Sequence, residues 1–274
     1  MTLLGDNLLP VVELEAVHVL FDNTCALDIE RLSIAQAERV FVLGRSGSGK
    51  TTLSRIIKGR LAPSTGKATV LQSLLHKQST DRSGAHTRRI AMIDQEFYLI
   101  PRLSVIDNIL SGCLGRVSTW KSIFDWYPEC ELEKAEGILR EVDLDGLGDR
   151  RVETLSGGQR QRTAIARALM QEADIILADE PISNLDPELA EDALELLIDC
   201  VLRRSVTLIV NLHQPALARR FASRIIGLSK GEVVYDGIPE DFTEEAAKFL
   251  YQANGNGDTV IKMSVNTGAV SPGS

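Results

Sequence analysis

Short apolar runs separated by turn residues recur along the chain, and several of them are continuous rather than alternating. The clearest are Val40–Leu43, Ile90–Ile93, Ile175–Ala178 and Val206–Leu212. A strand made only of apolar residues is buried on both faces, as in a parallel sheet that is covered by helices on each side. The pattern therefore predicts an α/β fold with a mostly parallel central sheet.

The N-terminal part shows a different pattern. Val11–Val19 and Ala26–Ile34 mix apolar and polar residues, and Asp22-Asn23 between them is a turn signal. We expect antiparallel strands there, outside the parallel core. Residues 60–88 are polar and rich in turn residues.

Helical periodicity fills most of the remaining chain. In the segment that begins at Lys50, Leu53, Ile56 and Ile57 share one face. Ser104-x-x-Asp107 is typical of a helix start, and Asp186-Pro187 combines an N-cap with a proline at the first helical position. The expected helices are Lys50–Lys58, Ser104–Leu110, Glu131–Val142, Gln159–Gln171 and the segment that Asp186 opens. Two further strands, Ile225–Leu228 and Glu232–Tyr235, flank a Lys-Gly turn.

Composition and charge narrow the function classes. The 274 residues carry a formal net charge of −8, and an acidic surface repels phosphate backbones, so we expect no nucleic-acid partner. No apolar run approaches the ~20 residues that span a bilayer. Residues 252–274 are rich in Gly, Asn, Ser and Thr, and we expect a flexible tail there, with a regulatory element as the alternative.

The segment Gly44–Thr51 (GRSGSGKT) carries the first chemical motif. It fits G-x-x-x-x-G-K-[ST] and lies between an expected strand and an expected helix. Glycines let backbone N–H groups turn inward around phosphates, and a helix N-terminus adds its positive dipole end. Lys50 then reaches the β- and γ-phosphates, and the Thr51 hydroxyl is a Mg²⁺ ligand.

Two more motifs follow. The buried strand Ile175–Ala178 ends in Asp179 and Glu180, and ligands of open α/β sheets lie beyond the carboxyl ends of the strands. Asp179 is therefore expected near Mg²⁺ and Glu180 near an attacking water. Leu155–Gln159 reads LSGGQ, directly before a helix, so Ser156 and two glycine N–H groups form a second anion site.

LSGGQ together with Arg160-Gln161-Arg162 and the two strand-end motifs resembles the signature of the ATP-binding cassette (ABC) family. Further positions match one at a time. Gln95 follows the Ile90–Ile93 strand as the Q-loop glutamine does, and residues 183–186 resemble the D-loop. His213 ends the Val206–Leu212 strand as the switch histidine does, and Phe21 stands where the family places a ring against adenine. Taken alone, Gln95 would be interpreted as a surface amide, His213 as a capping residue and Phe21 as an ordinary core ring.

The resemblance implies an ATPase that uses ATP and Mg²⁺. Catalytic roles then fall to Lys50, Gln95, Glu180 and His213, and the metal ligands are Thr51, Gln95 and Asp179. The nucleotide-binding residues that it implies are Phe21, Gly44, Arg45, Ser46, Gly47, Ser48, Gly49, Lys50, Thr51, Thr52, Gln95, Ser156, Gly157, Gly158, Gln159 and Asp186. Two positions depart from the family: Arg45 stands in place of a common Pro, and Asp94 in place of an aromatic residue.

The resemblance also implies the architecture and the partners. The fold is that of a P-loop NTPase (RecA-like), with a mostly parallel core, an N-terminal antiparallel β subdomain and a helical subdomain. The ATPase domain is expected at residues 11–251, with the helical subdomain at roughly 96–172. Two copies pair head to tail around two ATP molecules. They sit peripherally on the cytoplasmic face of the inner membrane, bound to two transmembrane permease subunits that a periplasmic or extracellular solute-binding protein serves.

A finer resemblance concerns the solute. The stretch from Ser111 to Ser122, which includes Trp120, is similar to the phosphonate-importer branch, as are Ile209–Gln214 (IVNLHQ) and Arg224–Gly227 (RIIG). This resemblance implies uptake of phosphonate, phosphite or hypophosphite. The solute is inferred only from the similarity to that branch, because the cassette itself does not touch the solute. An exporter or lipoprotein-releasing cassette, and a soluble non-transport ABC regulator, remain the alternatives.

Overall fold

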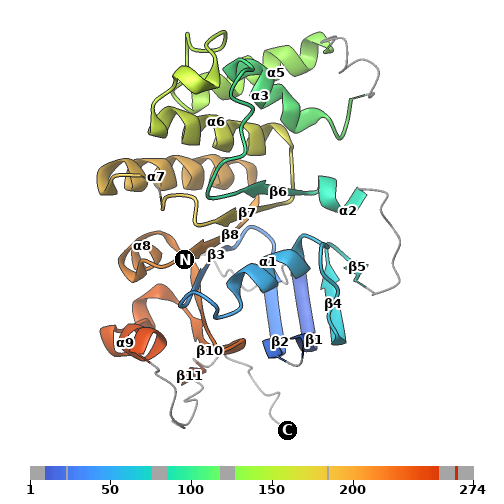
Figure 1. Ribbon diagram of the computed structural model, residues 1–274, viewed down its shortest axis with the longest axis vertical. Helices are drawn as coiled ribbons and strands as arrows, with labels where there is room; N and C mark the ends of the chain where they lie inside the picture. Colours follow the sequence, from blue (N-terminus) through green and yellow to red (C-terminus); the bar gives the residue numbers. More distant parts are fainter. Residues whose placement is uncertain are drawn as a thin grey trace, which may run out of the picture.

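The computed structural model describes residues 10–22, 24–75, 85–117, 127–183, 185–252 and 263–264. These residues form two sheets and several helices, arranged in layers (Figure 1). A group of helices lies at the top of the view, the strands of the larger sheet cross the middle, and the N-terminal sheet stands below α1. This arrangement confirms the expected α/β class.

The larger sheet carries the site. Its order is β11-β10-β9-β3-β8-β7-β6, and every neighbouring pair from β9 to β6 is parallel. Only β10 runs antiparallel to its neighbour β9. The strands are β3 (Arg39–Leu43), β6 (Ile90–Ile93), β7 (Ile175–Asp179), β8 (Thr207–Leu212), β9 (Arg224–Ser229), β10 (Glu232–Gly237) and β11 (Met263–Ser264).

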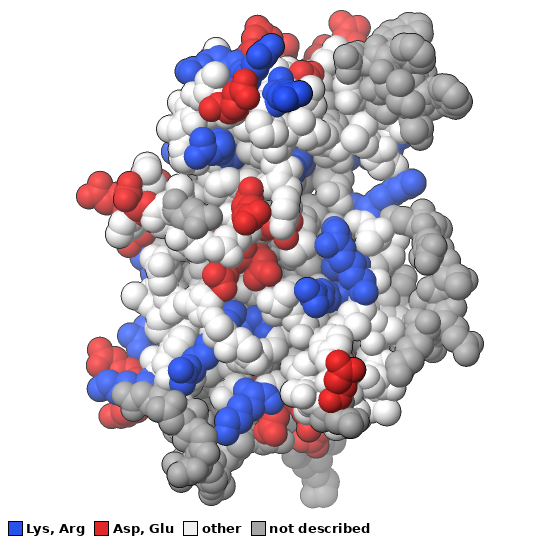
Figure 2. Space-filling view, viewed as in Figure 1, with Lys and Arg blue, Asp and Glu red and all other residues white. Residues whose placement is uncertain are grey.

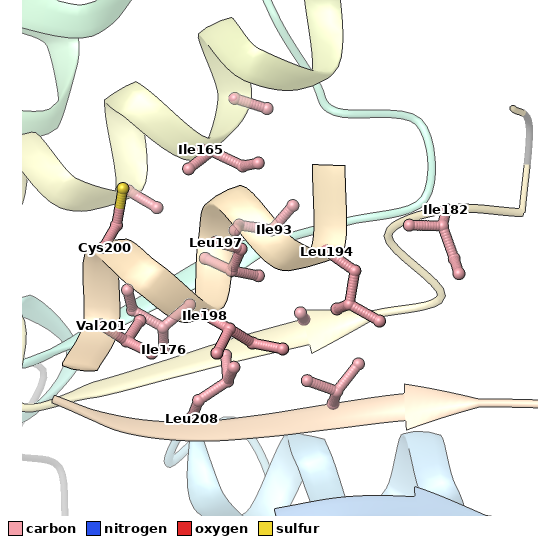
Figure 3. Close-up of a cluster of buried hydrophobic side chains, with 14 of the residues drawn as sticks. Ile93, Ile165, Ile176, Ile182, Leu194, Leu197, Ile198, Cys200, Val201 and Leu208 are labelled. Atoms are coloured by element: carbon pink, nitrogen blue, oxygen red, sulfur yellow. The ribbon is translucent and has the colours of Figure 1, made fainter. Parts of the chain in front are cut away.

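Both faces of this sheet are buried, as the continuous apolar runs predict. Alternate residues of one strand enter different clusters: Ile176 and Ala178 of β7 face one cluster, and Ile175 and Leu177 face the other. Figure 3 shows part of the first cluster, where Ile176 and Leu208 of the sheet point toward Leu194, Leu197, Ile198 and Val201 on the helix above. Burying such side chains stabilises the fold by roughly 2 kcal/mol each, so this packing fixes the positions of the strand ends.

The smaller sheet is antiparallel, in the order β2-β1-β4-β5. Its strands are β1 (Pro10–Phe21), β2 (Thr24–Ala35), β4 (Thr65–Val70) and β5 (Ser73–Leu74). The first two confirm the expected antiparallel pair. β4 lies within residues 60–88, which the sequence pattern describes only as turn-rich, because Ala68 and Val70 are its only buried side chains.

Helices cover the sheet, and those that follow Ser104 and Ser156 open with a side-chain cap. The helices are α1 (Lys50–Ile57), α2 (Ala85–Arg88), α3 (Val105–Leu110), α5 (Glu129–Glu141), α6 (Gly157–Met170), α7 (Pro187–Arg204), α8 (Pro215–Phe221) and α9 (Glu244–Gln252). The Ser104 hydroxyl accepts the Asp107 N–H at 3.1 Å, as predicted. Asp186 occupies the N-cap position of α7, but its side chain makes no capping bond.

Two helices begin two residues earlier than predicted, and one of them is α5, which begins at Glu129 rather than Glu131. The other is α6, which begins at Gly157 rather than Gln159. Ser156 and Gln159 form a capping box, in which each side chain bonds the backbone N–H of the other at 3.2 and 3.0 Å. Two successive glycines have poor helix propensity, so the sequence pattern assigns them to the loop, whereas the cap draws them into the first turn.

The C-terminal segment also differs from the expectation. α9 runs to Gln252, and Met263–Ser264 form the two-residue strand β11 parallel to β10. Of the tail expected from residue 252, the described residues include this two-residue strand, and its flexibility stays a prediction. No described helix is long and apolar enough to span a membrane.

Candidate active site

The parallel strands end at one edge of the sheet and bring the motifs together there. Leu43 is in register with Leu212, Asp179 with Asn211, and Ile93 with Ala178. The residues that follow these strands are Gly44, Glu180, His213 and Asp94-Gln95. The edge therefore carries the lysine-bearing loop, the carboxylates, the histidine and the glutamine, as the sequence predicts.

Glycines shape the loop between β3 and α1. Gly44 has φ +154°, and a Cβ there would lie 2.4 Å from the Leu228 carbonyl oxygen and 2.5 Å from the Ser48 Oγ. Gly49, directly before α1, has φ +109°, a conformation that favours glycine. The loop wraps closely at both ends, and Arg45, Ser46 and Gly47 between them are exposed. An exposed, glycine-bounded loop at a helix start is suited to hold phosphates.

Lys50 is buried at the base of this loop, with 6% of its surface exposed. Its Nζ donates to the carbonyl oxygen of Gly44 at 2.6 Å and to that of Arg45 at 3.2 Å. Burial lowers the pKa of Lys50, while the negative charges of Glu180 and Asp179 act in the opposite direction. The ammonium thus lies in the field of both carboxylates, which joins the first two motifs electrostatically.

Asp179 is held by a residue that the sequence motifs did not identify. Asn211, 2% exposed, donates from Nδ2 to Asp179 Oδ1 at 2.9 Å and to the Ser54 Oγ of α1 at 2.9 Å. Asn211 therefore links β7, β8 and α1 through one amide. The signal in the sequence is an isolated amide inside the apolar run Val206–Leu212, because a buried polar side chain requires partners.

Glu180 and His213 face each other across the strand ends. His213 Nε2 lies 2.5 Å from Glu180 Oε1, and both side chains remain partly exposed, at 35% and 27%. Glu180 has φ +48° and donates its N–H to the Asn211 carbonyl oxygen at 3.1 Å. The sheet fixes the backbone that turns the carboxylate toward the histidine, and solvent reaches the pair.

Gln95 begins a loop that a second unpredicted residue holds. Phe97 and Tyr98 both adopt positive φ, at 59° and 43°. Arg167 of α6 donates from Nη2 to the Phe97 carbonyl oxygen at 2.6 Å and from Nη1 to that of Tyr98 at 2.7 Å. Gln95 itself is exposed. The clamp ties the loop after β6 to the helix that LSGGQ opens.

Asp94, the departure from the family pattern, is half-buried beside this loop. Burial raises its pKa, with the charge of Arg60 as the main opposing influence and those of Arg167 and Lys58 also opposing. Lys58 and Arg60 follow α1 and Arg167 belongs to α6, so cations from two segments of the chain act on this carboxylate.

The LSGGQ segment makes only local hydrogen bonds. Ser156 is exposed and its hydroxyl accepts the Gln159 N–H, while Arg160 donates to the Leu155 carbonyl oxygen at 2.7 Å. Cβ atoms on Gly157 and Gly158 would meet Leu185 and Leu189, which belong to the segment around the start of α7. Among the described residues, no hydrogen bond connects Ser156 with the Lys50 loop.

The other predicted site residues are placed as follows. Phe21, at the end of β1, is 44% exposed, as a ring that stacks on a ligand must be. Thr51 and Asp186 are exposed, and Thr52 is half-buried. Asn184 of the D-loop segment and Trp120 of the helical insert lie outside the described residues.

The donor set fits a nucleotide with a hard cation. Mg²⁺ prefers oxygen ligands and uses one or two carboxylates together with phosphates. Thr51 supplies an exposed hydroxyl on the first turn of α1, and Asp179 supplies an oriented carboxylate at the neighbouring strand end. Figure 2 shows acidic side chains gathered near mid-height of the molecule, with Lys and Arg side chains beside them.

Comparison with known proteins gives a consistent picture. The profile of a family described as "ABC transporter" matches residues 27–183. A "Phosphonates import ATP-binding protein PhnC 2" of Rhodopseudomonas palustris (strain BisA53) is 40% identical over 247 residues, which cover 88% of this chain and 90% of the relative. A "Phosphonates import ATP-binding protein PhnC 1" of Synechococcus sp. (strain JA-2-3B'a(2-13)) is 41% identical over 242 residues, covering 88% and 92%.

Solved structures agree with the fold. CbiO1 from Clostridium perfringens, part of the ABC transporter complex cbiONQ, superposes with a TM-score of 0.76 at 25% identity, over 86% of this chain and 92% of its own. The dimeric post-hydrolysis state of the ATP-binding cassette MJ0796, bound to ADP and Pi, gives a TM-score of 0.70 at 30% identity, over 83% and 98%.

Proposed function

This chain belongs to the ABC transporter family and is an ATPase coupled to transport, and we propose that it powers uptake of phosphonate or a related reduced-phosphorus oxyanion, phosphite or hypophosphite. The observation that carries the ATPase function is the meeting of Lys50, Asp179, Glu180 and His213 at one sheet edge. The solute class rests on relatives that are named phosphonate import proteins and match over nearly their whole length. The exporter, lipoprotein-releasing and regulator alternatives are not favoured.

The loop residues bind and orient the triphosphate. Backbone N–H groups of Gly44–Gly49 and the N-terminus of α1 surround the phosphates, and Lys50 contacts the β- and γ-phosphates. Arg45 and Ser46, exposed in the same loop, add contacts from its outer side. Phe21 stacks on the adenine from the end of β1. Phosphates compete with the carbonyl oxygens of Gly44 and Arg45 for the Lys50 ammonium.

Glu180 and His213 act on the water and the γ-phosphate. The Glu180 carboxylate orients the attacking water and accepts its proton, because it is partly exposed and, among the described residues, no Lys or Arg side chain forms an ion pair with it. His213 contacts the γ-phosphate from the neighbouring strand end. Gln95 approaches the same phosphate from its clamped loop, and Asn211 keeps Asp179 oriented.

Mg²⁺ held by Thr51, Asp179 and Gln95 would neutralise the charge that develops on the phosphates. The chain's own contribution is a carboxylate whose orientation is fixed by Asn211 and a hydroxyl whose position is fixed by the first turn of α1.

A second copy of the chain completes each ATP site. Ser156 is exposed and Gly157 and Gly158 are half-buried at the N-terminus of α6, and no hydrogen bond among the described residues joins them to the Lys50 loop. The related cassette MJ0796 is dimeric. A head-to-tail pair in which each Ser156 tip meets the partner's Lys50 loop closes two sites at once. Asp186, at the start of α7, lies beside this tip.

Transport requires further subunits. We expect two permease subunits in the membrane, with this chain bound peripherally on their cytoplasmic side, and a solute-binding protein that delivers the oxyanion from outside. The decisive experiment reconstitutes the complex in proteoliposomes and compares ATPase stimulation by phosphonate, phosphite, hypophosphite and phosphate. Stimulation by none of the reduced-phosphorus oxyanions would contradict the solute assignment.

The ATPase assignment has its own test. Glu180→Gln should lower ATP turnover by at least about 100-fold while MgATP binding persists, so that an ATP-bound dimer accumulates in size-exclusion chromatography. Glu191→Gln, which only removes a surface ion pair with Arg220, is the matched control and should hydrolyse ATP at the wild-type rate. If Glu180→Gln also hydrolyses at that rate, Glu180 does not have the proposed role.

A further inference from the structure

The C-terminal helix places a buried hydroxyl beside the phosphate loop. Tyr251, in the last turn of α9, has an Oη that solvent does not reach and that has no hydrogen-bond partner at normal distance among the described residues. Leaving such a group unpaired destabilises the folded protein. A buried hydroxyl without a partner in a well-packed helix end requires an explanation.

Packing shows what this hydroxyl faces. Leu250, 2% exposed, lies against Gly227 of β9, where an added Cβ would come within 3.4 Å of it. Gly227 is in register with Leu43, the last residue of β3. The end of α9 therefore covers the point where β3 passes into Gly44.

The backbone of Gly44 is the polar group that acts on Tyr251. Burial raises the pKa of the phenol, and Gly44 is the one opposing influence. Lowering a phenol's pKa requires a donor to its oxygen, so the group that faces Oη is the Gly44 N–H. On the other side of the Gly44 Cα, the carbonyl oxygen accepts the Lys50 ammonium at 2.6 Å.

Gly44 thus stands between Lys50 and Tyr251. When phosphates draw the lysine away from the Gly44 carbonyl oxygen, the flanking peptides become free to adjust. Gly44 has φ +154°, and a Cβ there would lie 2.4 Å from the Leu228 carbonyl oxygen, so the close packing around this residue is compatible with glycine. A rotation that brings the N–H onto the waiting oxygen satisfies a buried hydroxyl and is therefore favoured.

We propose that Tyr251 is a positioning residue for the phosphate loop: its hydroxyl accepts the Gly44 N–H when Lys50 engages the triphosphate, and it links nucleotide occupancy to α9. The inference rests on the proposed function in that the loop binds ATP. It adds a role for the C-terminal helix, which none of the sequence motifs includes.

The test compares two tyrosines that differ in what their hydroxyls do. Tyr251→Phe removes the waiting acceptor. Tyr235→Phe is the matched control, because Tyr235 is also buried, packs on Phe242 and bonds only the Ile238 carbonyl oxygen at 2.8 Å. We expect Tyr251→Phe to weaken binding of a fluorescent ATP analogue about three- to tenfold, which is the loss of one net hydrogen bond, with kcat changed less than KM. Tyr235→Phe should leave binding unchanged.

Hydrogen exchange tests the same link without a substitution. In wild-type protein, amides of residues 244–252 should gain protection when the ATP analogue binds, and in Tyr251→Phe this gain should disappear. Equal nucleotide affinity in all three proteins, an equal loss in both variants, or no added protection of α9 in wild type would overturn the inference. If wild-type protein binds no nucleotide at all, the proposed function fails as well, and the two failures are distinguished.

Discussion

Arg167 controls the loop that carries Gln95, and its replacement by lysine is the sharpest test of that loop's design. The guanidinium bonds two successive carbonyl oxygens, those of Phe97 and Tyr98, at 2.6 and 2.7 Å. Both residues hold positive φ, a conformation that costs a non-glycine residue about 1–2 kcal/mol. Hydrogen bonds to a charged donor contribute about 1.5–3 kcal/mol each, so two of them roughly offset the strain of two residues.

Lysine is a point donor that does not reproduce the fork of the guanidinium. Arg167→Lys keeps at most one bond, and about 1.5 kcal/mol of the loop's stabilisation is lost. That is enough to shift the loop toward ordinary backbone angles and to displace Gln95, two residues from Phe97. We expect the free energy of unfolding to fall by about 1.5 kcal/mol, hydrogen exchange of residues 97–100 to accelerate about tenfold, and ATP turnover to fall.

Arg162→Lys is the control on the same helix. Arg162 also makes two bonds from its guanidinium, to the Val142 carbonyl oxygen and to Asp143, but neither reaches the loop. Its replacement should cost less than about 1 kcal/mol and leave exchange of residues 97–100 unchanged. If the two variants show the same exchange in this loop, Arg167 does not hold it and the reasoning is refuted.

Two further predictions concern carboxylates that neighbouring side chains hold in place, Asp179 and Glu141. Asn211→Asp places a second carboxylate against Asp179, so we expect ATPase activity to fall at least about tenfold and the free energy of unfolding by about 2–4 kcal/mol; wild-type turnover would contradict the bridge. Bonds from Arg204 and Arg203 lower the pKa of Glu141 from 4.5 to about 2. The folded pKa is depressed, so this stabilisation is present above pH 4.5 and lost as pH falls toward 2. After screening it amounts to about 1–2 kcal/mol, and urea titrations of Glu141→Gln should lack that part of the acid sensitivity.

The central sheet follows from the sequence because burial on both faces imposes continuous apolar runs. Ile175–Ala178 and Val206–Leu212 need no context to be recognised, and they form β7 and β8 with shifts of one residue. β4 has no such signature. Residues Thr65–Val70 form a strand because they pair with β1, which lies about fifty residues earlier in the chain. Position 66 requires glycine, because a Cβ there would lie 2.0 Å from the Ala16 carbonyl oxygen.

The residues of the candidate site also fall into two groups, those that the sequence pattern reveals and those that it does not. The loop that carries Lys50, and Glu180 and His213, are marked by motif or by strand-end position, and the structure brings them to one edge. Asn211 and Arg167 act from other elements, through an amide inside a strand and a guanidinium within a helix. Such residues gain their role only from tertiary packing, so local pattern does not reveal them.

The charges around the Lys50 loop indicate what one chain supplies to a bound triphosphate. The buried Lys50 ammonium faces two carboxylates, Asp179 and Glu180, and burial has already lowered its pKa. A triphosphate bound at the loop adds negative charge beside Asp179 and Glu180, whose two carboxylates already outnumber the Lys50 ammonium. The positive end of the α1 helix dipole and a divalent cation would offset part of this negative charge. A further donor set would reduce the rest of this negative charge, and the capped N-terminus of α6, with Ser156 exposed and two glycines in its first turn, is one. Among the described residues Ser156 makes only local hydrogen bonds, and we propose that a second copy of the chain supplies the donor set that closes the site.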